Sequence, residues 1–267
     1  MTSHHNDLED TVPQLICSGV DGLLVDDKGF LPDLDNFVRE LQKGALFSLV
    51  FPGSDETQYH QIKDLTPHNY AFLAQGTIIT DGQEVNPAWQ SAMLSVSPTD
   101  IMAKNNYLAH LTSQYSGGGV STNEIPSQHL YTVSFPERLQ ATEINRLQSE
   151  ADQAGLQITD YHNGEHVVHF FSKQGGIANA INHIWHTQGC TEVPRPEQVF
   201  GIGCELHDLP MLKGIEGKLF TVENAHSDVK SYVASRDGYV SPRSHTDGFK
   251  EIVNYIKPMF PDGQLED

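Results

Sequence analysis

A five-residue segment in the last third of the chain carries four side chains that could perform chemistry. Cys204 and His207 form a Cys-x-x-His pair, and Glu205 and Asp208 add two carboxylates. Thiolate, imidazole and carboxylate are all zinc ligands, and a thiol beside an imidazole base could also be a nucleophile. No second cluster at ligand spacing accompanies this one. A small buried thiol at the end of a strand is therefore the simpler expectation for Cys204.

Asp21 is a second candidate, because it follows an apolar run and precedes a glycine. Together with Asp208 it could supply a general acid and a carboxylate that helps to hold a metal ion. Aspartate before glycine in a loop and aspartate at the opening of a helical turn also have ordinary structural roles. The two carboxylates therefore admit a catalytic and a structural interpretation.

Three histidines and a glycine pair could also bind a ligand. His162, His166 and His169 surround a predicted hairpin, where alternate residues share a face. His166 and His169 are separated by an odd number and would face opposite sides, so a metal site made of all three is not expected. Gly175-Gly176 precedes a predicted helix whose N-terminus could hold a phosphate, although a hinge between domains explains the pair equally well.

The apolar pattern predicts the scaffold that must position these residues. Apolar runs at 15–17 and 45–51 indicate buried strands, and the residues between them include a segment with helical spacing at 33–41. The last third repeats this pattern, with a helix at 177–186, strands at 199–202 and 219–222, and a helix at 249–256. Strands that alternate with helices are typical of an α/β protein with a parallel sheet.

The middle of the chain has a different order of predicted helices and strands, which indicates a separate small α/β unit. Its expected elements are helices at 97–115 and 141–154, a strand at 131–135, and a hairpin of strands 156–161 and 166–171 across Asn163-Gly164. We therefore predict a core domain made of residues 1–83 and 171–267, with a cap domain inserted at 84–170.

The amino-acid composition restricts the binding partners and the cellular compartment that we expect. The 267 residues include 35 acidic and 16 basic side chains, and a net charge of −19 makes nucleic acid and anionic membranes poor partners. No apolar run approaches the roughly 20 residues of a membrane span, and no apolar leader segment is present near the first residue. The three cysteines are scattered, which suits a reducing compartment. We expect a soluble cytoplasmic protein.

Four segments in the order expected carry a resemblance to a known family. The apolar strand with Gly19-Val20-Asp21-Gly22 resembles the Asp-x-Asp-Gly-Thr loop of haloacid-dehalogenase (HAD) phosphatases, and 201–212 resembles their later signature, Gly-Asp-x-x-Asn-Asp followed by Pro-Met-Leu. Segments 221–226 and 244–248 are similar to the branch that contains sucrose-phosphatase, mannosyl-3-phosphoglycerate-phosphatase and Cof-like proteins. The resemblance implies a Rossmannoid parallel-sheet core with an inserted α/β cap.

The same resemblance assigns roles to particular positions. In these phosphatases one aspartate attacks phosphorus, a second protonates the leaving oxygen, and carboxylates hold Mg²⁺. The nucleophile position is Gly19 here, whereas the acid/base position is retained as Asp21. The metal-binding aspartate is replaced by Cys204, and Asp208 survives as a weak or vestigial metal ligand.

The phosphate-binding residues also differ from the family pattern. Ile177 stands where the phosphate-binding lysine is expected, and Lys173 lies four residues earlier. Pro52-Gly53-Ser54 replaces a Thr-Gly-Arg turn. Ser54 and Lys173 are therefore the candidate phosphate contacts.

These replacements lead to a non-catalytic interpretation. We expect a pseudophosphatase with a HAD-like fold that binds a sugar, a sugar phosphate or a protein partner, with no cofactor. The alternative is a Mg²⁺-dependent sugar-phosphate phosphatase that uses residues outside the family pattern. A third reading is zinc chemistry at Cys204.

Overall fold

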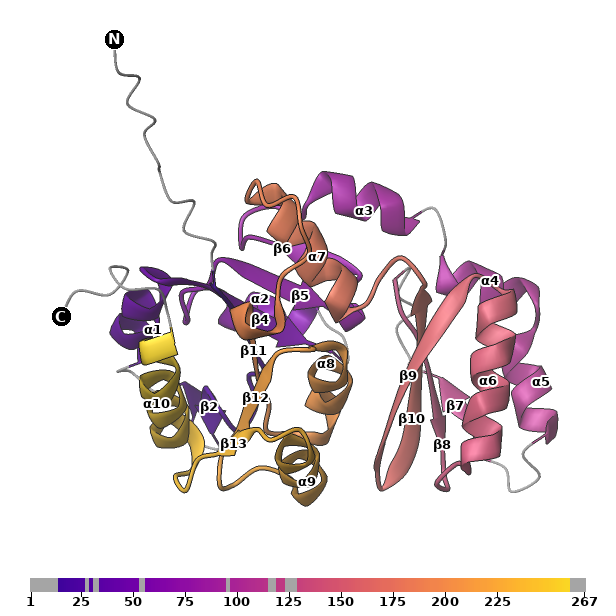
Figure 1. Cartoon of the computed structure of the whole chain (residues 1–267). Coiled ribbons are helices and arrows are strands. Elements are labelled where there is room, and N and C mark those ends of the chain that lie inside the picture. Colours follow the sequence, from indigo (N-terminus) through magenta and orange to yellow (C-terminus); the bar gives the residue numbers. More distant parts are fainter. Residues whose placement is uncertain are drawn as a thin grey trace, which may run out of the picture.

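The computed structural model describes residues 14–26, 29–30, 34–52, 56–94, 97–114, 119–122 and 129–259. These residues form two α/β units, each built around its own sheet (Figure 1). Below, the main domain is the seven-stranded sheet with its helices. The insert is the four-stranded sheet with helices α4 (Pro98–Lys104), α5 (Tyr107–Gln114) and α6 (Ala141–Gln153). Ser54 lies outside the described residues.

The main sheet combines strands from both ends of the chain, in the order β13-β12-β11-β1-β4-β5-β6. Neighbouring strands are parallel except for the antiparallel pair β5–β6. The strands are β1 (Gln14–Ser18), β4 (Ala45–Phe51), β5 (Tyr70–Leu73), β6 (Ile78–Thr80), β11 (Val199–Ile202), β12 (Lys218–Thr221) and β13 (Tyr239–Val240). This arrangement confirms the predicted parallel-sheet core into which a second unit is inserted.

Helices cover both faces of this sheet. The path β1 to β4 to β5 and the path β11 to β12 to β13 run in opposite directions from the centre, so right-handed crossovers place their helices on opposite faces. On one face α1 packs against α10, with the rings of Phe37 and Phe249 6.4 Å apart, and on the other α7 contacts α8 (Figure 1). These helices and the smaller elements are α1 (Leu34–Gln42), α2 (Glu56–Ile62), α7 (Ile177–Thr187), α8 (Leu209–Gly214), α9 (Ser227–Ser235), α10 (His245–Ile256) and the hairpin of β2 (Val25–Asp26) with β3 (Gly29–Phe30).

Burial on both faces explains the unbroken apolar runs of the central strands. All five residues of β1 and all four residues of β11 are buried. A strand whose two faces are both covered has apolar side chains at consecutive positions. These strands therefore appear in the sequence as continuous apolar runs, without the alternation of apolar and polar residues seen in half-exposed strands.

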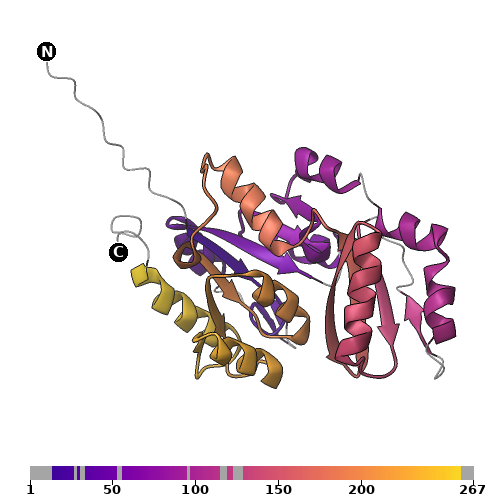
Figure 2. The ribbon, with the colours of Figure 1, turned by 45° about the vertical axis from the view of Figure 1, so that its right-hand side comes forward.

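The insert has a separate apolar core. Its sheet runs in the order β7-β8-β10-β9 with antiparallel neighbours. Its elements are α4 (Pro98–Lys104), α5 (Tyr107–Gln114), β7 (Ser121–Thr122), β8 (Tyr131–Phe135), α6 (Ala141–Gln153), β9 (Leu156–Asn163) and β10 (Glu165–Ser172). Gly164 adopts a φ of +74° between β9 and β10, so the predicted hairpin turn is confirmed. Figure 2 shows α6 lying across this sheet.

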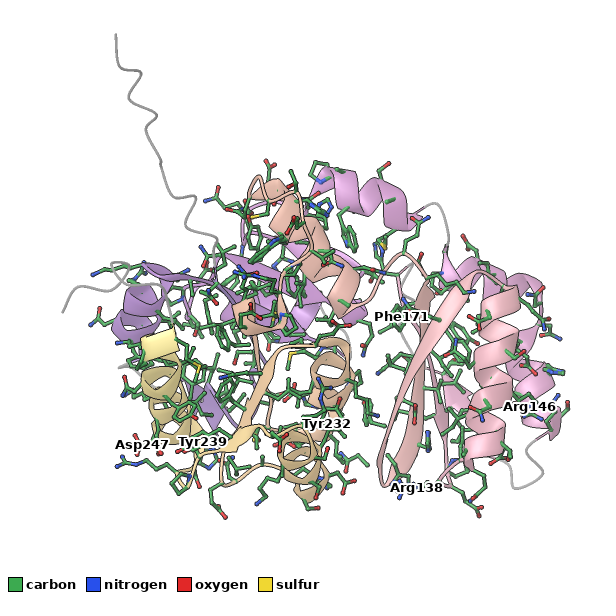
Figure 3. The ribbon with its side chains drawn as sticks, viewed as in Figure 1. Arg138, Arg146, Phe171, Tyr232, Tyr239 and Asp247 are labelled. Carbon is green, nitrogen blue, oxygen red and sulfur yellow. The ribbon has the colours of Figure 1, made fainter. Side chains whose placement is uncertain are left out.

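Two details of the insert differ from expectation. The helix expected over 97–115 is two helices, because Asn106 adopts a φ of +47° between α4 and α5. Helix α3 (Pro87–Leu94) falls within the predicted cap range, yet its Trp89 and Met93 are buried in the core of the main domain. Phe171, near the end of β10, is buried in that core as well (Figure 3).

No helix in the described part of the chain is both long and apolar enough to cross a membrane.

Candidate functional site

The carboxyl ends of β1 and β11 bring the main candidate residues together. Ser18 pairs with Ile202 in the parallel register, and the Gly19 N–H donates to the Ile202 carbonyl over 2.9 Å. Ligands of α/β sheets bind at this edge because the strands end there and the loops diverge. Nε2 of His207 lies 3.6 Å from Oδ2 of Asp21, so the two distant loops meet at this edge.

Asp208 occupies the centre of this site and is completely buried. Its Oδ2 accepts hydrogen bonds from the backbone N–H groups of Cys204 (2.8 Å) and Glu205 (3.0 Å). Its Oδ1 accepts no hydrogen bond within the described part of the chain, and Nε2 of His207 lies 3.8 Å from it. Burial raises the pKa of Asp208, because the ionised form loses its hydration there.

The carboxylate of Asp208 fills the space above Gly19. A Cβ atom on residue 19 would lie 2.5 Å from Oδ1 and 2.6 Å from Oδ2 of Asp208, which is far closer than non-bonded atoms approach. A Cβ on Gly203 would likewise lie 2.9 Å from Cβ of Asp208. The inward position of Asp208 therefore depends on glycine at both neighbouring strand ends.

Cys204 lies in an environment that keeps its thiol neutral. The residue is buried, Nδ2 of Asn224 lies 3.5 Å from Sγ, and Oε1 of Glu205 lies 3.9 Å from it. Burial raises the pKa of the thiol strongly, and nearby carboxylates raise it further. The thiolate is the form that attacks electrophiles, so this environment disfavours the nucleophile interpretation. Zinc is disfavoured because no three His, Cys, Asp or Glu side chains of the described residues are placed together to hold it.

Asn224 ties three segments of the main domain together. Its Nδ2 donates to the carbonyl of Gly22 over 3.1 Å, and its Oδ1 accepts from the backbone N–H of His245 over 2.6 Å. The segments 221–226 and 244–248, singled out from the sequence, thus both meet the loop that follows β1. This contact holds the loop that carries Asp21.

The residues at this sheet edge do not fit Mg²⁺, the ion that the resembled phosphatases use. The described residues contain no group of three or more His, Cys, Asp or Glu side chains placed to hold a metal ion. Oδ2 of Asp208 already accepts two backbone N–H groups, and Cys204 offers a thiol where an oxygen donor is needed.

The candidate phosphate contacts are placed as follows. Lys173 forms an ion pair with Asp152 of α6 (2.9 Å) and donates to the carbonyl of the same residue. Ile177 is buried at the first turn of α7. Ser54, outside the described residues, stays a prediction, and so does a phosphate role for Lys173.

The Gly175-Gly176 pair is held by amide side chains from both units. The carbonyl of Gly175 accepts from Nε2 of Gln157 on β9 (3.0 Å) and from Nδ2 of Asn179 on α7 (2.8 Å). A Cβ on Gly76 would lie 2.9 Å from the carbonyl carbon of Gly176, so the linker packs closely on the main domain. These contacts fix the glycine pair at the junction of the two units, and its hinge and phosphate roles both stay predictions.

The histidines of the insert separate onto two faces, as their spacing predicts. Figure 1 shows α6 on the face of this sheet that is turned away from the main domain. By strand alternation His166 shares the face of Val168 and Phe170, which belong to the core of the insert, and His169 is on the opposite face. Nδ1 of His169 is 2.9 Å from Oγ1 of Thr132. Burial and, to a smaller extent, the charge of His207 together lower the pKa of His169 to about 4.

A cavity of about 370 Å³ lies between the insert and the main domain, beside the Asp208 site. It is lined by the start of α6 and the β9–β10 hairpin on one side, and by α8 and the start of α9 on the other. Two of its lining residues, Arg138 and Lys213, went unnoticed in the sequence. The chain has only 16 basic residues, and this small number was the signal that could have singled out each arginine and lysine as a candidate for binding an anion.

Comparison with solved structures finds proteins whose fold is similar to that of this chain, and three of them are described here. The chain is similar to the sucrose-phosphatase of Synechocystis sp. PCC6803 solved with sucrose and phosphate (TM-score 0.68, 16% identity, 91% of this chain and 98% of that chain). It is also similar to a phosphatase of the haloalkanoate (HAD) enzyme superfamily from Bacteroides thetaiotaomicron (0.61, 15%, 96% and 99%) and to a haloacid dehalogenase-like hydrolase from Bacillus subtilis (0.55, 11%, 92% and 93%). No protein-family model and no curated protein matches the sequence.

Proposed function

Since the chain has the HAD-like fold with an inserted cap, we propose that it is a pseudophosphatase that binds a small sugar or sugar phosphate without hydrolysing it. The proposal rests on the relationship between Gly19 and Asp208. Covalent phosphoryl transfer needs a carboxylate on residue 19, and here that position has no side chain while Asp208 fills the space beside it. Loss of the nucleophile from a set of residues that act as a unit costs on the order of 10⁶ in rate.

The fold leaves room for a ligand although the site lacks a nucleophile. The cavity between the insert and the main domain has the size of a small-molecule site. Strand β9 of the insert contacts α8 of the main domain directly, so a molecule in the cavity would touch both units. The sucrose-phosphatase neighbour was solved with sucrose and phosphate, which makes these two compounds the first probes.

The test is a phosphate-release assay with Mg²⁺ on a panel of sugar phosphates, together with calorimetric titration of sucrose and inorganic phosphate. We expect no release above background and saturable binding of a panel compound. Turnover by the wild type that Asp21→Ala abolishes would support the alternative, a Mg²⁺-dependent sugar-phosphate phosphatase, and would overturn the proposal.

A further inference from the structure

We propose that the cavity between the insert and the main domain binds the anionic group of a small organic ligand between Arg138 and Lys213, away from the Gly19–Asp208 site. This inference rests on the proposed binding function and adds the charge and position of the ligand. Ile177, where the resemblance places a phosphate-binding lysine, is not among the residues that line this cavity.

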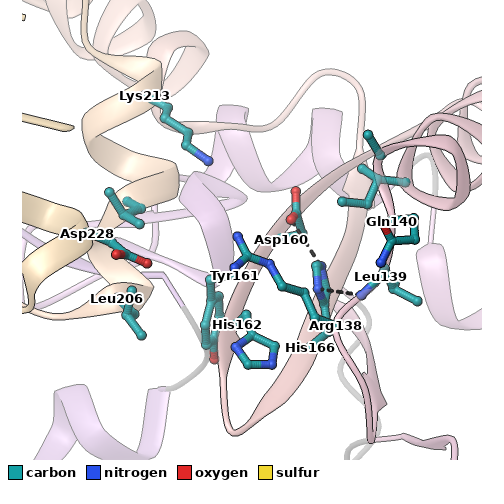
Figure 4. Close-up of a pocket in the computed structure, with 13 residues that line it drawn as sticks. Arg138, Leu139, Gln140, Asp160, Tyr161, His162, His166, Leu206, Lys213 and Asp228 are labelled. Carbon is teal, nitrogen blue, oxygen red and sulfur yellow. Dashed lines mark hydrogen bonds and ion pairs between the residues drawn. The ribbon is translucent and has the colours of Figure 1, made fainter. Parts of the chain in front are cut away.

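The two cations come from different units and meet at one space. Arg138 lies in the loop between β8 and α6 of the insert, and Lys213 lies on α8 of the main domain. Figure 4 shows both side chains extending into the space between the units. Neither forms an ion pair within the described part of the chain. Neither side chain is therefore held in a direct ion pair with the described residues, and the charge they share with the cavity is that of Asp160, whose pKa His166, Lys213 and Arg138 all lower.

The cavity also holds two carboxylates, and each has a partner other than the two cations. Oδ2 of Asp160 is 3.1 Å from Nε2 of His166, and Nδ1 of His166 accepts the N–H of Leu139 (Figure 4). These two contacts fix the position of the Asp160 side chain on the insert. Asp228 lies in the first turn of α9, where the positive end of the helix dipole offsets its charge.

The remaining walls suit the uncharged part of an organic molecule. Leu206 and Leu209 line the cavity from the main domain, and Ile144 and Tyr161 line it from the insert. Small-molecule sites commonly combine such apolar surface with a few polar groups that fix orientation. A bare inorganic anion would leave this surface unused, so we infer an organic anion.

The neighbouring sheet edge does not suit an anion. Asp21, Asp208 and Glu205 place carboxylates there, and Cys204 is held as a neutral thiol. A phosphate or carboxylate group would be repelled at that edge and attracted to Arg138 and Lys213. The ligand is therefore oriented with its charge in the cavity.

Calorimetric titration at low salt tests this inference with four probes. Glucose 6-phosphate and gluconate carry an organic phosphate and an organic carboxylate, inorganic phosphate is an anion without an organic part, and glucose is the uncharged control. We expect saturable binding of at least one organic anion, with weaker binding of inorganic phosphate and glucose. Whichever organic anion binds identifies the charged group.

Variants locate the binding. Arg138→Gln and Lys213→Gln should each weaken binding of that anion at least about tenfold, as expected for loss of a charge-assisted hydrogen bond. Arg138→Lys and Lys213→Arg should restore part of the affinity. Arg146→Gln on α6 and the exposed Lys218→Gln remove the same charges elsewhere and should leave binding unchanged.

Three results would overturn the inference: no saturable binding of either organic anion, equal loss in the control variants, or tighter binding of glucose than of the anions. Phosphate release measured in the same samples reports separately on the proposed lack of catalysis. A failure of one proposal is thus distinguishable from a failure of the other.

Discussion

A Cβ atom on residue 19 would lie 2.5 Å from Oδ1 of Asp208, so these two positions, which are far apart in the sequence, share one space at the end of β1. Glycine at position 19 admits the buried carboxylate, and the backbone N–H groups of Cys204 and Glu205 hold it there. The absence of a nucleophilic side chain at Gly19 and the inward position of the Asp208 carboxylate are therefore linked by geometry.

The first prediction concerns this shared space. Gly19→Ala should lower the free energy of unfolding by about 1–3 kcal/mol, the usual cost of overpacking. Asp208→Ala should also destabilise, because two buried N–H groups lose their acceptor. In the double variant Gly19→Ala should cost almost nothing. Chemical denaturation of the three variants measures this coupling.

Gly214→Ala is the matched control, because a Cβ there would meet its neighbours only at 3.8 Å. Additive effects of Gly19→Ala and Asp208→Ala would contradict the shared space.

The second prediction concerns magnesium. The site should not bind Mg²⁺ at sub-millimolar concentration, because Oδ1 is the one oxygen of Asp208 without a hydrogen bond in the described part of the chain and Cys204 supplies no oxygen. Calorimetric titration with MgCl₂ checks this. Saturable binding that disappears in Asp208→Ala would show the site to be a metal centre.

The third prediction concerns attempts to restore catalysis. Gly19→Asp should be inactive toward sugar phosphates and should melt at a lower temperature than the wild type, since its side chain must displace Asp208. Activity could return only when Gly19→Asp, Cys204→Asp and Ile177→Lys are combined, which supplies the nucleophile, the metal carboxylate and the cation together. Phosphate release with Mg²⁺ is measured for each variant, and turnover by Gly19→Asp alone would refute this account.

The fourth prediction concerns thiol reactivity. Cys17 and Cys204 are fully buried, and burial raises the pKa of both thiols, whereas Cys190 is partly exposed. A thiol reagent should therefore modify one cysteine in the native protein and three after denaturation. Cys190→Ser should abolish the native reaction. Rapid labelling of Cys204 in that variant would revive the nucleophile interpretation.

The fifth prediction concerns acid stability. The pKa of His169 is about 4 in the folded protein, below its ordinary value of about 6.5. On acidification the unfolded chain binds this proton first, so stability is retained at pH 6.5 and lost as the pH falls toward 4. The loss is on the order of 3 kcal/mol.

His169→Gln removes the titrating group and keeps a polar side chain. Denaturant unfolding at pH 4.5 and 7 should show a smaller acid loss for this variant than for the wild type. An equal loss in both proteins would mean that His169 is protonated in the fold.

Local pattern was enough to predict much of the fold. Buried strands such as β1 and β11 are continuous apolar runs, and the Asn163-Gly164 turn joins β9 and β10 because glycine accepts the positive φ that the turn needs. The order of the motifs predicted that the two ends of the chain share one sheet, and the absence of a side chain at Gly19 was visible in the sequence. These properties depend on residue type and spacing alone.

Tertiary structure decided how the remaining side chains are used. That Asp208 turns inward over Gly19, that Lys173 pairs with Asp152, and that Arg138 and Lys213 meet at one cavity all depend on rotamers and on how the insert docks against the main domain. Such contacts join residues that are distant in the chain, and no local periodicity encodes them. The sequence by itself therefore determined the fold and the missing nucleophile, whereas three-dimensional packing decided what fills the nucleophile's place and where a ligand's charge can bind.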